Sequence, residues 1–494
     1  MYLLGLDIGT SSIKASIVNA ASTQVVAAAQ YPDIESPIDS PKTGWAEQNP
    51  EMWWENTQKA IDRAVTKAGI SAAEIASIGI SYQMHGLVIV DKNQEVLRPS
   101  IIWCDSRAVE IGEKAFGEIG HYKALKHLLN SPGNFTASKL AWVKENEPEV
   151  YAKCDKIMLP GDFIAMKLTG KVSTTNSGMS EGIFWDFCDN TLSADIMSTY
   201  GFSQELIPEI KQVFDNHGEV TAAISQKMGL KEGTPVTYKA GDQPNNALSL
   251  NVLNPGEIAA TAGTSGVVYA VSDQVAFDPK SRINSFAHVN HQLDNATRIG
   301  ILLCINGTGI MNSWVKKNIA KGIDYPEMNA EAQKVPAGSD GLIVLPFGNG
   351  VERMLENKQV GAKMVNLDLN KHTDAHIYRA VQEGIAFSFR YGFEMMKANG
   401  LKPKVIRAGQ ANMFLSPVFT ETLVNSTQTP VELYDTDGAK GAALGGGFGA
   451  RIYDSLADAM GGLTLIKTIQ PAPVDENLEA SYKAWCLELE KALA

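Results

Sequence analysis

The sequence predicts a mixed α/β protein of two domains, and three observations support this. The chain has 494 residues, and because domains usually hold about 100–200 residues, two or three are expected. Short apolar runs typical of strands alternate with helical patterns from the N-terminus onward. Two such runs around a Gly-Thr-Ser turn occur twice, at Gly9 and at Gly263, about half a chain apart. The matching flanks of the two turns indicate an ancient duplication.

The first half opens on strands and then on a well-delimited helix. The helix is expected over residues 50–68, because Pro50 suits a first helical turn and Gly69 suits the position after the last. The turn Gln83-Met84-His85-Gly86 separates two further strands. Strands are expected at residues 2–7, 12–18, 24–30, 75–82 and 87–91.

The second half repeats the strand pair and adds long helices. The run D-G-A-K-G-A-A-L-G-G-G-F-G-A reads as a helix of small residues, which allows another backbone or a flat ligand to approach closely. Strands are expected on both sides of the second Gly-Thr-Ser turn, and two further strands at residues 405–406 and 431–434. Helices are expected at residues 374–399, 416–425 and 437–450.

Composition excludes several classes of protein. The 43 Lys and Arg against 55 Asp and Glu give a formal net charge of −12, which disfavours nucleic acid or an anionic membrane as the main partner. The five cysteines are scattered without a C-x-x-C pair, so neither a disulfide framework nor a zinc site is expected. There is no basic, apolar leader and no apolar run of the ~18–20 residues that span a bilayer. A cytoplasmic location is expected.

The two Gly-Thr-Ser turns could bind phosphate. Successive backbone N–H groups of a tight turn can point at one anion, and the hydroxyls add donors. Asp7 precedes the first turn, where a carboxylate could hold Mg²⁺ between phosphates. Neither turn has the spacing of a P-loop, and no G-x-G-x-x-G is present. The alternative is that both turns are plain hairpin connections.

Two other stretches carry groups that could act on a substrate. Asp242 follows a strand and precedes a helical run, so its carboxylate could take a proton from a hydroxyl, or it could simply cap the helix. Met84 and His85 lie in a loop at a strand end, where small ligands often bind. The alternative for these two is a buried histidine beside a core methionine.

Eight motifs, taken in order, give the sequence a specific resemblance. They are D-I-G-T-S-S-I-K-A, W-A-E-Q-N-P-E-M-W-W, Q-M-H-G-L-V-I-V-D, R-P-S-I-I-W-C-D-S-R, L-P-G-D-F-I-A-M-K-L-T-G, A-G-D-Q, T-A-G-T-S-G-V-V-Y-A and G-A-A-L-G-G-G. Over about residues 3–450 the chain resembles the FGGY family of carbohydrate kinases, and most of all the members that phosphorylate D-xylulose.

The resemblance implies a fold and a division of the chain. The fold is a pair of duplicated ribonuclease-H-like domains, of the actin, hexokinase and Hsp70 type, flanking a catalytic cleft. Residues 1–235 would form the N-terminal, sugar-binding domain with the first phosphate motif. Residues 236–476 would form the C-terminal domain with the catalytic base and the nucleotide side. Residues 477–494 would form a helix packing back on the first domain.

The resemblance also implies an activity and a set of residues. The activity is ATP-dependent phosphorylation of a ketopentose, D-xylulose to D-xylulose 5-phosphate, with Mg²⁺ and ATP. Asp242 would be the general base and contact the sugar, and Asp7 would organise Mg²⁺ and the transferring phosphoryl group. The other implied contacts are Met84 and His85 to the sugar, Thr10, Gly263 and Thr264 to the phosphates, and Gly409 and Asn412 near the adenosine.

Departures from the family pattern keep alternatives open. Ala408-Gly409-Gln410 stands where consecutive glycines are common, Pro244-Asn245-Asn246 stands where small residues usually follow the base, and residues 350–354 replace the usual G-E-R-T-P. The sugar could therefore be another ketose or a polyol, such as ribulose, fuculose, gluconate or glycerol. A non-catalytic sugar or nucleotide sensor, or an ATPase of the chaperone and actin sort, are the rival classes. The resemblance also implies a homodimer.

Overall fold

The computed structural model describes residues 1–494, which form two compact units. Unit 1 comprises Met1–Asn251, Ser285–Ile299 and Thr436–Leu463, and unit 2 comprises Val252–Asn284, Gly300–Asp435 and Thr464–Ala494. The expected division at residue 235 is wrong in two respects. First, the strand and helix that follow residue 235 belong to unit 1, because that strand pairs within the unit 1 sheet. Second, the chain returns twice to unit 1 after it has entered unit 2.

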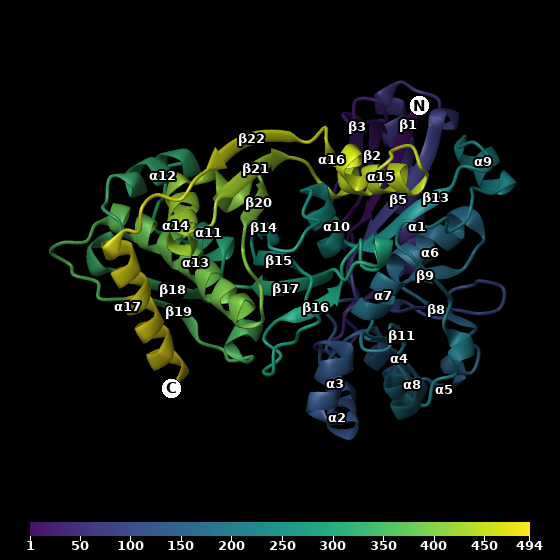
Figure 1. The fold of residues 1–494 in the computed structure, drawn as a ribbon, viewed down its shortest axis with the longest axis horizontal. Coiled ribbons are helices and arrows are strands. Elements are labelled where there is room, and N and C mark those ends of the chain that lie inside the picture. Colours follow the sequence, from purple (N-terminus) through teal and green to yellow (C-terminus); the bar gives the residue numbers. More distant parts are fainter. The chain divides into compact units, whose positions relative to one another are not determined.

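Unit 1 is built on a five-stranded sheet in the order β13-β5-β1-β2-β3 (Figure 1). The central strand β1 pairs antiparallel with β2 and parallel with β5, and β5 pairs parallel with β13. The strands are β1 (Tyr2–Ile8), β2 (Ile13–Asn19), β3 (Val25–Tyr31), β5 (Ile75–Tyr82) and β13 (Val236–Gly241). The strands predicted in this region are confirmed to within a residue or two at each end.

Two helices cover opposite faces of this sheet. Helix α1 (Pro50–Ala68) begins after the N-cap Asn49 and ends at Gly69, which has a left-handed φ of 65°, as predicted. It packs on β2 and β3 and buries Trp53 among the apolar side chains of the sheet. Helix α15 (Gly438–Gly449) covers the other face, against β1 and β5. A Cβ on Gly5 or on Gly79 would lie 1.8 Å from an α15 carbonyl oxygen, so only glycine allows this approach.

The rest of unit 1 consists of short elements around the sheet. The helices are α2 (Val109–Ile119), α3 (His121–Leu128), α4 (Thr136–Asn146), α5 (Pro148–Tyr151), α6 (Pro160–Thr169), α7 (Asn176–Glu181), α8 (Ala194–Tyr200), α9 (Ala222–Met228), α10 (Asp242–Ser249) and α16 (Leu456–Met460). The short strands are β4 (Glu47–Gln48), β6 (Val88–Val90), β7 (Ser100–Ile101), β8 (Lys156–Met158), β9 (Ser173–Thr175), β10 (Trp185–Asp186), β11 (Thr191–Leu192), β12 (Glu209–Lys211) and β16 (Asn284–Ala287), of which all but the first residue lies in this unit.

Unit 2 repeats the strand arrangement of unit 1. Its strands run consecutively as β17-β15-β14-β20-β21-β22, with β14 antiparallel to β15 and parallel to β20, and β20 parallel to β21. The order β17-β15-β14-β20-β21 corresponds to β3-β2-β1-β5-β13, and the three pairings from β15 to β21 have the same directions as those from β2 to β13, which confirms the duplicated fold. The strands are β14 (Glu257–Ala262), β15 (Gly266–Ser272), β17 (Ile299–Ile305), β18 (Ile343–Phe347), β19 (Gly361–Val365), β20 (Val405–Gly409), β21 (Val431–Asp435) and β22 (Thr464–Ile469).

The helices of unit 2 bury their apolar faces in a second core. The long helix α13 carries Ile385, Phe389 and Phe393 fully buried in that core, at the spacing the sequence predicts for one helical face. The helices are α11 (Gly309–Asn318), α12 (Tyr325–Gln333), α13 (Asp374–Ala398), α14 (Pro417–Thr427) and α17 (Glu476–Leu493).

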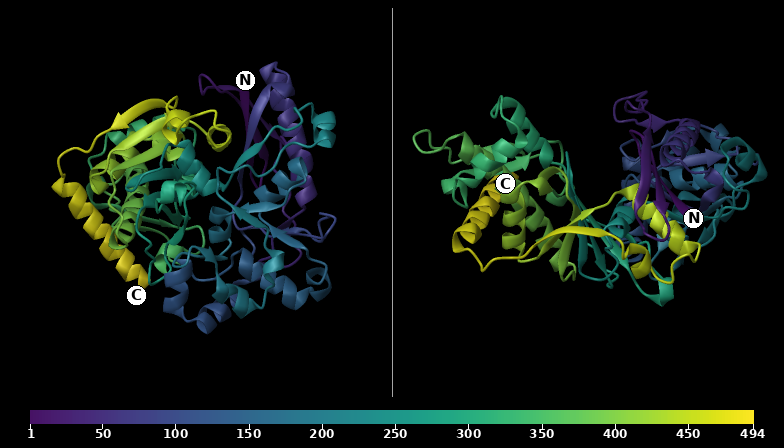
Figure 2. Two further views of the ribbon diagram at one scale, coloured as in Figure 1. Left: turned by 45° about the vertical axis from the view of Figure 1, so that its right-hand side comes forward. Right: turned by 90° about the horizontal axis from the view of Figure 1, so that it is seen from above.

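The C-terminal helix α17 does not pack back on the first unit, as the sequence led us to expect. It belongs to unit 2, where Figure 2 shows it beside the green helices of the same unit. Leu478, Tyr482, Trp485 and Leu489 are buried in the core of unit 2. The indole N–H of Trp485 donates to the carbonyl oxygen of Val344 at 2.9 Å. The apolar face of α17 therefore packs against β18 and α13.

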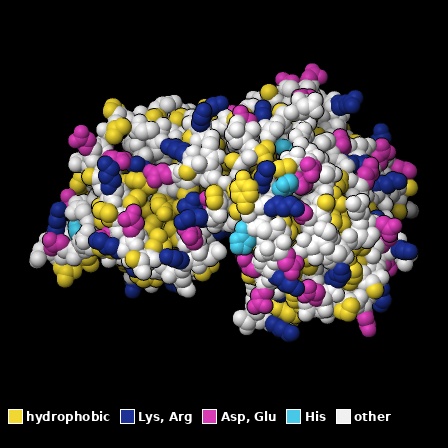
Figure 3. Space-filling model, turned by 60° about the horizontal axis from the view of Figure 1, so that its bottom comes forward, with side chains coloured by type: hydrophobic (Ala, Val, Ile, Leu, Met, Phe, Trp, Pro, Cys, Tyr) yellow, Lys and Arg dark blue, Asp and Glu magenta, His cyan; other side chains and the backbone are white.

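The surface carries charges of both signs. Figure 3 shows Lys and Arg interspersed with Asp and Glu over the face drawn, rather than one continuous basic field. No helix of the structure combines the length and apolar character needed to cross a bilayer.

Candidate functional site

The first group of predicted residues lies at one edge of the unit 1 sheet. Asp7 is in register with Ser81 of β5, and Ser81 is in register with Ala240 of β13. Because the three strands are parallel and adjacent, their carboxyl ends meet at the same edge. Asp242, two residues beyond Ala240, is the first residue of α10. The fold therefore brings Asp7 and Asp242, 235 positions apart in sequence, to the same edge of the sheet, with β5 between their two strands.

The two carboxyl groups share an environment that disfavours charge. Burial and, to a smaller extent, the negative charge of Asp7 raise the pKa of Asp242 to about 7, against hydrogen bonds from Gln243 that oppose the shift. Burial likewise raises the pKa of Asp7, against the hydrogen bond from the Ser81 hydroxyl, whose Oγ lies 3.0 Å from Oδ1. A carboxylate whose pKa lies near neutrality is suited to accept a proton from a hydroxyl.

The N-terminus of α15 adds oxygen donors beside Asp7. Asp437 caps this helix by accepting from the Lys440 amide, and its other oxygen accepts from Lys14 Nζ at 2.8 Å. A Cβ on Gly438 would lie 2.9 Å from Asp7 Oδ2 and 3.3 Å from Asn246 Oδ1. Mg²⁺ prefers carboxylate and amide oxygens and is often held by one or two carboxylates plus phosphates. This donor set fits a magnesium ion.

The loop Gln83–Gly86 is tied to its surroundings through His85. His85 has a left-handed φ of 63°, an uncommon conformation for a residue with a side chain. Its carbonyl oxygen accepts from Lys139 Nζ at 2.8 Å, and its ring packs edge-on against Phe135. Its Nδ1 lies 3.0 Å from the backbone oxygen of Glu181, and because a carbonyl only accepts, Nδ1 carries the proton. Met84 beside it is 5% exposed.

Thr10 is engaged within unit 1. Its hydroxyl donates to Gln83 Oε1 and accepts from the Trp103 indole, both at 3.0 Å. Its carbonyl oxygen accepts from Gln48 Nε2 at 2.9 Å. Trp103 is 54% exposed, so this network fixes a large aromatic side chain beside the first Gly-Thr-Ser turn. The sequence did not single out Trp103, although it lies within one of the eight motifs.

The second group of predicted residues lines a cavity of 750 Å³ within unit 2. Gly263, Thr264 and Asn412 are among its lining residues, and a Cβ on Gly263 would lie 3.6 Å from Asn412 Nδ2. The carbonyl oxygens of Gly263 and Thr264 accept from the first amides of α11, at 2.9 and 3.0 Å, which ties the turn to that helix. A cavity of this volume is within the range of small-molecule and cofactor sites.

Other residues of the cavity were missed, and Gly409 is absent from its lining. Tyr325, Asn329 and Gln333 line the cavity from α12, and their spacing of four places them on one helical face. That spacing is the only signal in the sequence for these cavity residues. Polar residues spaced in this way usually form the solvent-exposed face of a helix. Gly409 ends β20, three residues before Asn412.

Residues 350–354, which had no expected role, support the same region. Both carboxyl oxygens of Glu352, which is fully buried, accept backbone N–H groups, those of Asn306 at 3.0 Å and Gly307 at 2.8 Å. A Cβ on Gly307 would lie 2.1 Å from the Pro346 carbonyl oxygen. Glu352 therefore fixes the loop that leads into α11, and through it the cavity wall.

Two buried ionisable residues of unit 1 were also missed. Lys139 is fully buried, and burial lowers its pKa to about 7. Glu181 is 2% exposed and ends α7, a six-residue helix that is buried throughout. The sequence of that helix, N-S-G-M-S-E, is mostly polar, so a hydropathy pattern gives no hint of its burial.

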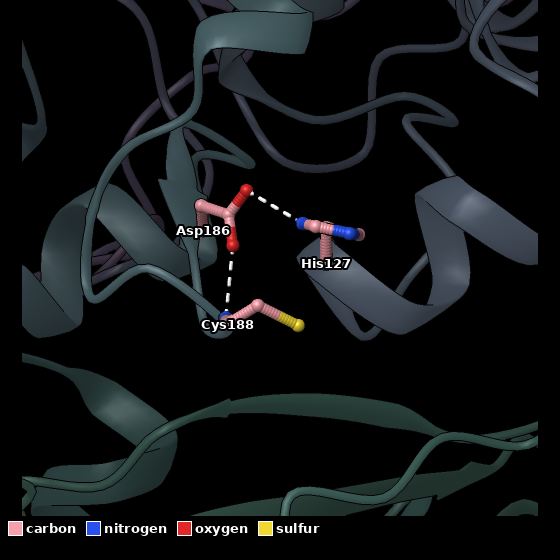
Figure 4. Close-up of side chains that lie close together, drawn as sticks. All are labelled: His127, Asp186 and Cys188. Carbon is pink, nitrogen blue, oxygen red and sulfur yellow. Dashed lines mark hydrogen bonds and ion pairs between the residues drawn. The ribbon is translucent and has the colours of Figure 1, made fainter.

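A cluster outside this edge of the sheet brings His127, Asp186 and Cys188 together (Figure 4). His127 Nδ1 lies 2.8 Å from Asp186 Oδ2, while Asp186 Oδ1 accepts the Cys188 and Asp189 amides. Burial and the charge of Asp186 raise the pKa of the Cys188 thiol. Asp186 therefore joins the His127 ring to the backbone of the β10–β11 turn, while the Cys188 thiol contacts the Lys126 carbonyl oxygen at 3.6 Å.

Comparison with known proteins adds independent evidence. Two family models match, both of the FGGY family of carbohydrate kinases: the N-terminal domain over residues 2–249 and the C-terminal domain over residues 258–449. A xylulose kinase of Bacillus subtilis is 28% identical over 469 residues, covering 92% of this chain and 90% of that protein. The crystal structure of xylulose kinase from Rhodospirillum rubrum matches with a TM-score of 0.88 and 26% identity over 99% of each chain. Plasmodium falciparum glycerol kinase, at 20% identity and a TM-score of 0.89 over 100% and 98% of the two chains, shares the fold.

Proposed function

Since the chain belongs to the FGGY family of carbohydrate kinases, we propose that it transfers the γ-phosphoryl group of ATP to D-xylulose, giving D-xylulose 5-phosphate and ADP. The choice of sugar is supported by the xylulose kinases among its relatives and by the Met84–His85 pair. The observation that carries the assignment is Asp242, a carboxyl group with a pKa of about 7 at the sheet edge it shares with Asp7.

Asp242 acts as the general base. Its carboxylate accepts the proton of the sugar 5-hydroxyl as that oxygen bonds to the γ-phosphorus, and the bond from the γ-phosphorus to the β,γ-bridging oxygen breaks. The proton ends on Asp242 and the electron pair on ADP. In such transfers the protein mainly positions the reactants and neutralises charge. Mg²⁺, held by Asp7, would neutralise charge on the phosphates.

The nucleotide binds in the unit 2 cavity. Gly263 and Thr264 contact the phosphates there, and Asn412 lies near the adenosine, since all three line that cavity. Thr10 contributes its backbone at the first turn, because its hydroxyl is held by Gln83 and Trp103. Gly409 shapes the turn before Asn412. The cytoplasmic location and the homodimer expected from the sequence stay predictions.

A panel of sugars tests the substrate. ADP release should depend on added sugar, be fastest with D-xylulose, and stop in excess chelator of Mg²⁺. The panel includes ribulose, fuculose, gluconate and glycerol, with a no-sugar control. A faster reaction with one of these would replace xylulose by that sugar. Release without sugar would favour an ATPase, and no release with any sugar would favour a sensor.

The pH dependence of the reaction should report Asp242. Because only the ionised carboxylate accepts a proton and its pKa is about 7, kcat/KM for the sugar should rise with pH and level off above about 7. Below that value it should fall about tenfold for each pH unit, as expected for loss of one essential base. Initial rates between pH 5 and 9 with saturating ATP measure this. A flat profile down to pH 5 would contradict the role of Asp242.

A further inference from the structure

Glu181 lies directly behind the residues assigned to the sugar. A Cβ on Gly241, the residue before Asp242, would lie 3.2 Å from Glu181 Oε2, 2.6 Å from Met84 Cγ and 3.2 Å from Met84 Sδ. The backbone oxygen of Glu181 accepts a hydrogen bond from the His85 Nδ1–H group at 3.0 Å. The side chains of Glu181 and Met84 therefore converge on the β13–α10 junction that carries the base, and Glu181 also holds His85.

The carboxyl group of Glu181 has no strong cationic partner. Both oxygens are buried, and the Tyr82 hydroxyl is the side-chain group placed to hydrogen-bond them. The groups that face it are Tyr82 of β5, His85, Asp162 of α6, Asp242 of α10 and Lys139 of α4. Of the two bases among these, Lys139 Nζ donates to the carbonyl oxygens of His85 and Ile102. His85 Nδ1 lies 3.7 Å from Glu181 Oε2, and its N–H group already donates to the backbone oxygen of Glu181.

An ionised carboxylate in such a place is costly. A buried ionisable group that lacks a partner of opposite charge commonly becomes neutral instead. Asp242 and Asp162 would add repulsion. In agreement, burial raises the pKa of Glu181 well above its usual range, and this outweighs the hydrogen bond from Tyr82, which lowers it; the charges of Asp242 and Asp162 also act to raise it.

We propose that Glu181 is a positioning residue of the sugar site: a neutral carboxylic acid that supports Met84, His85 and the base Asp242 from behind without adding a negative charge beside the base. This inference rests on the proposed function, since it assigns Glu181 to the same site. A second anion here would oppose ionisation of Asp242 and the approach of the ATP phosphates. Neutral Glu181 fills this space, and Asp242 is then the one of the two carboxyl groups that carries the negative charge.

Kinetics of two variants test the role. Glu181→Ala removes the support, so the KM for the sugar should rise about tenfold or more, while the KM for ATP stays unchanged, because geometry is lost only on the sugar side. Glu181→Gln keeps the shape and the neutral state, so it should bring the sugar KM back to within about threefold of wild type.

Thermal unfolding tests the charge state separately, and does not need an active protein. A Glu in an unfolded chain has a pKa of about 4.3, whereas the folded pKa is raised. Between these values the folded state binds the proton more tightly, so the stability of the wild type falls as pH rises. Glu181→Gln cannot ionise, and its Tm should exceed that of the wild type by a margin that grows from pH 5 to pH 8.

Glu47→Gln is the matched control, a buried glutamate of the same unit that is paired. Its Oε1 lies 2.5 Å from Arg98 Nη2 and 2.6 Å from Arg107 Nη1, so this variant should lower Tm at pH 8. A Glu181→Gln variant that is as impaired as Glu181→Ala, or that melts below the wild type at pH 8, would overturn the neutral acid. A wild-type sugar KM in Glu181→Ala would overturn the positioning role. If the wild type itself phosphorylates no sugar, the proposed function fails instead, and the unfolding result still decides the charge state.

Discussion

Replacing Asp242 by asparagine should lower kcat for sugar phosphorylation by about 10²–10⁴-fold, the usual effect of removing a general base. The variant keeps the shape of the side chain but cannot accept the hydroxyl proton. ATP binding should be unchanged, because the cavity proposed for the nucleotide is lined by residues of unit 2. Steady-state assays with saturating D-xylulose and ATP, together with calorimetric titration of ATP, measure the two properties separately.

Asp189→Asn is the matched control for this experiment. Asp189 is exposed in the β10–β11 turn of the same unit, and its variant should retain the wild-type kcat. A kcat within about fivefold of wild type in Asp242→Asn would contradict the role of the base, because that factor corresponds to only about 1 kcal/mol of barrier.

Replacing Lys239 by methionine should destabilise unit 1 by about 3–5 kcal/mol, the usual cost of breaking a buried ion pair from one side. Lys239 is fully buried in β13, and its Nζ lies 2.6 Å from Asp162 Oδ1 and 2.6 Å from the Ser173 carbonyl oxygen. The substitution leaves the Asp162 carboxylate buried without its cation. Urea and thermal unfolding, followed by a probe in unit 1, measure the loss.

Two further variants check the cause. Lys114→Met breaks an exposed pair of the same unit, with Lys114 Nζ 3.9 Å from Glu118 Oε1, and should change stability by about 0.5 kcal/mol or less. Adding Asp162→Leu to Lys239→Met removes the orphaned charge and should recover part of the loss. An unaltered unfolding midpoint in Lys239→Met would show that the buried pair contributes nothing.

The regular elements could be predicted because their signals are local. Asn49, Pro50 and Gly69 mark both ends of α1, and the two Gly-Thr-Ser hairpins reveal the repeated sheet. The division into units could not be predicted, because it depends on which sheet a helix covers. The small residues of α15 indicate that another element packs closely on this helix. They do not indicate that this element is the pair of N-terminal strands β1 and β5. The C-terminal helix shows an apolar stripe without indicating which core receives it.

The site was predictable where a motif carries the residue. Asp7, Asp242, Met84 and His85 lie at the expected strand ends, and Gly263, Thr264 and Asn412 line one cavity. Lys139, Glu181 and Glu352 were missed, because each acts through a buried contact with a distant backbone or side chain. Hydropathy assigns such residues to the surface. Only the fold shows that they are enclosed.

The dependence of unit 1 on α15 has a consequence for biosynthesis. The strands β1 and β5 leave the ribosome first, yet the helix that covers one face of them begins at Gly438, after all but the last strand and helix of unit 2. Until then that sheet face, with its glycines and neighbouring apolar side chains, has no native cover, and Asp7 lacks the helix end that completes its surroundings. About four hundred residues are synthesised between β1 and α15. Unit 1 is therefore the first unit to be synthesised in part, but it can complete its fold only near the end of synthesis.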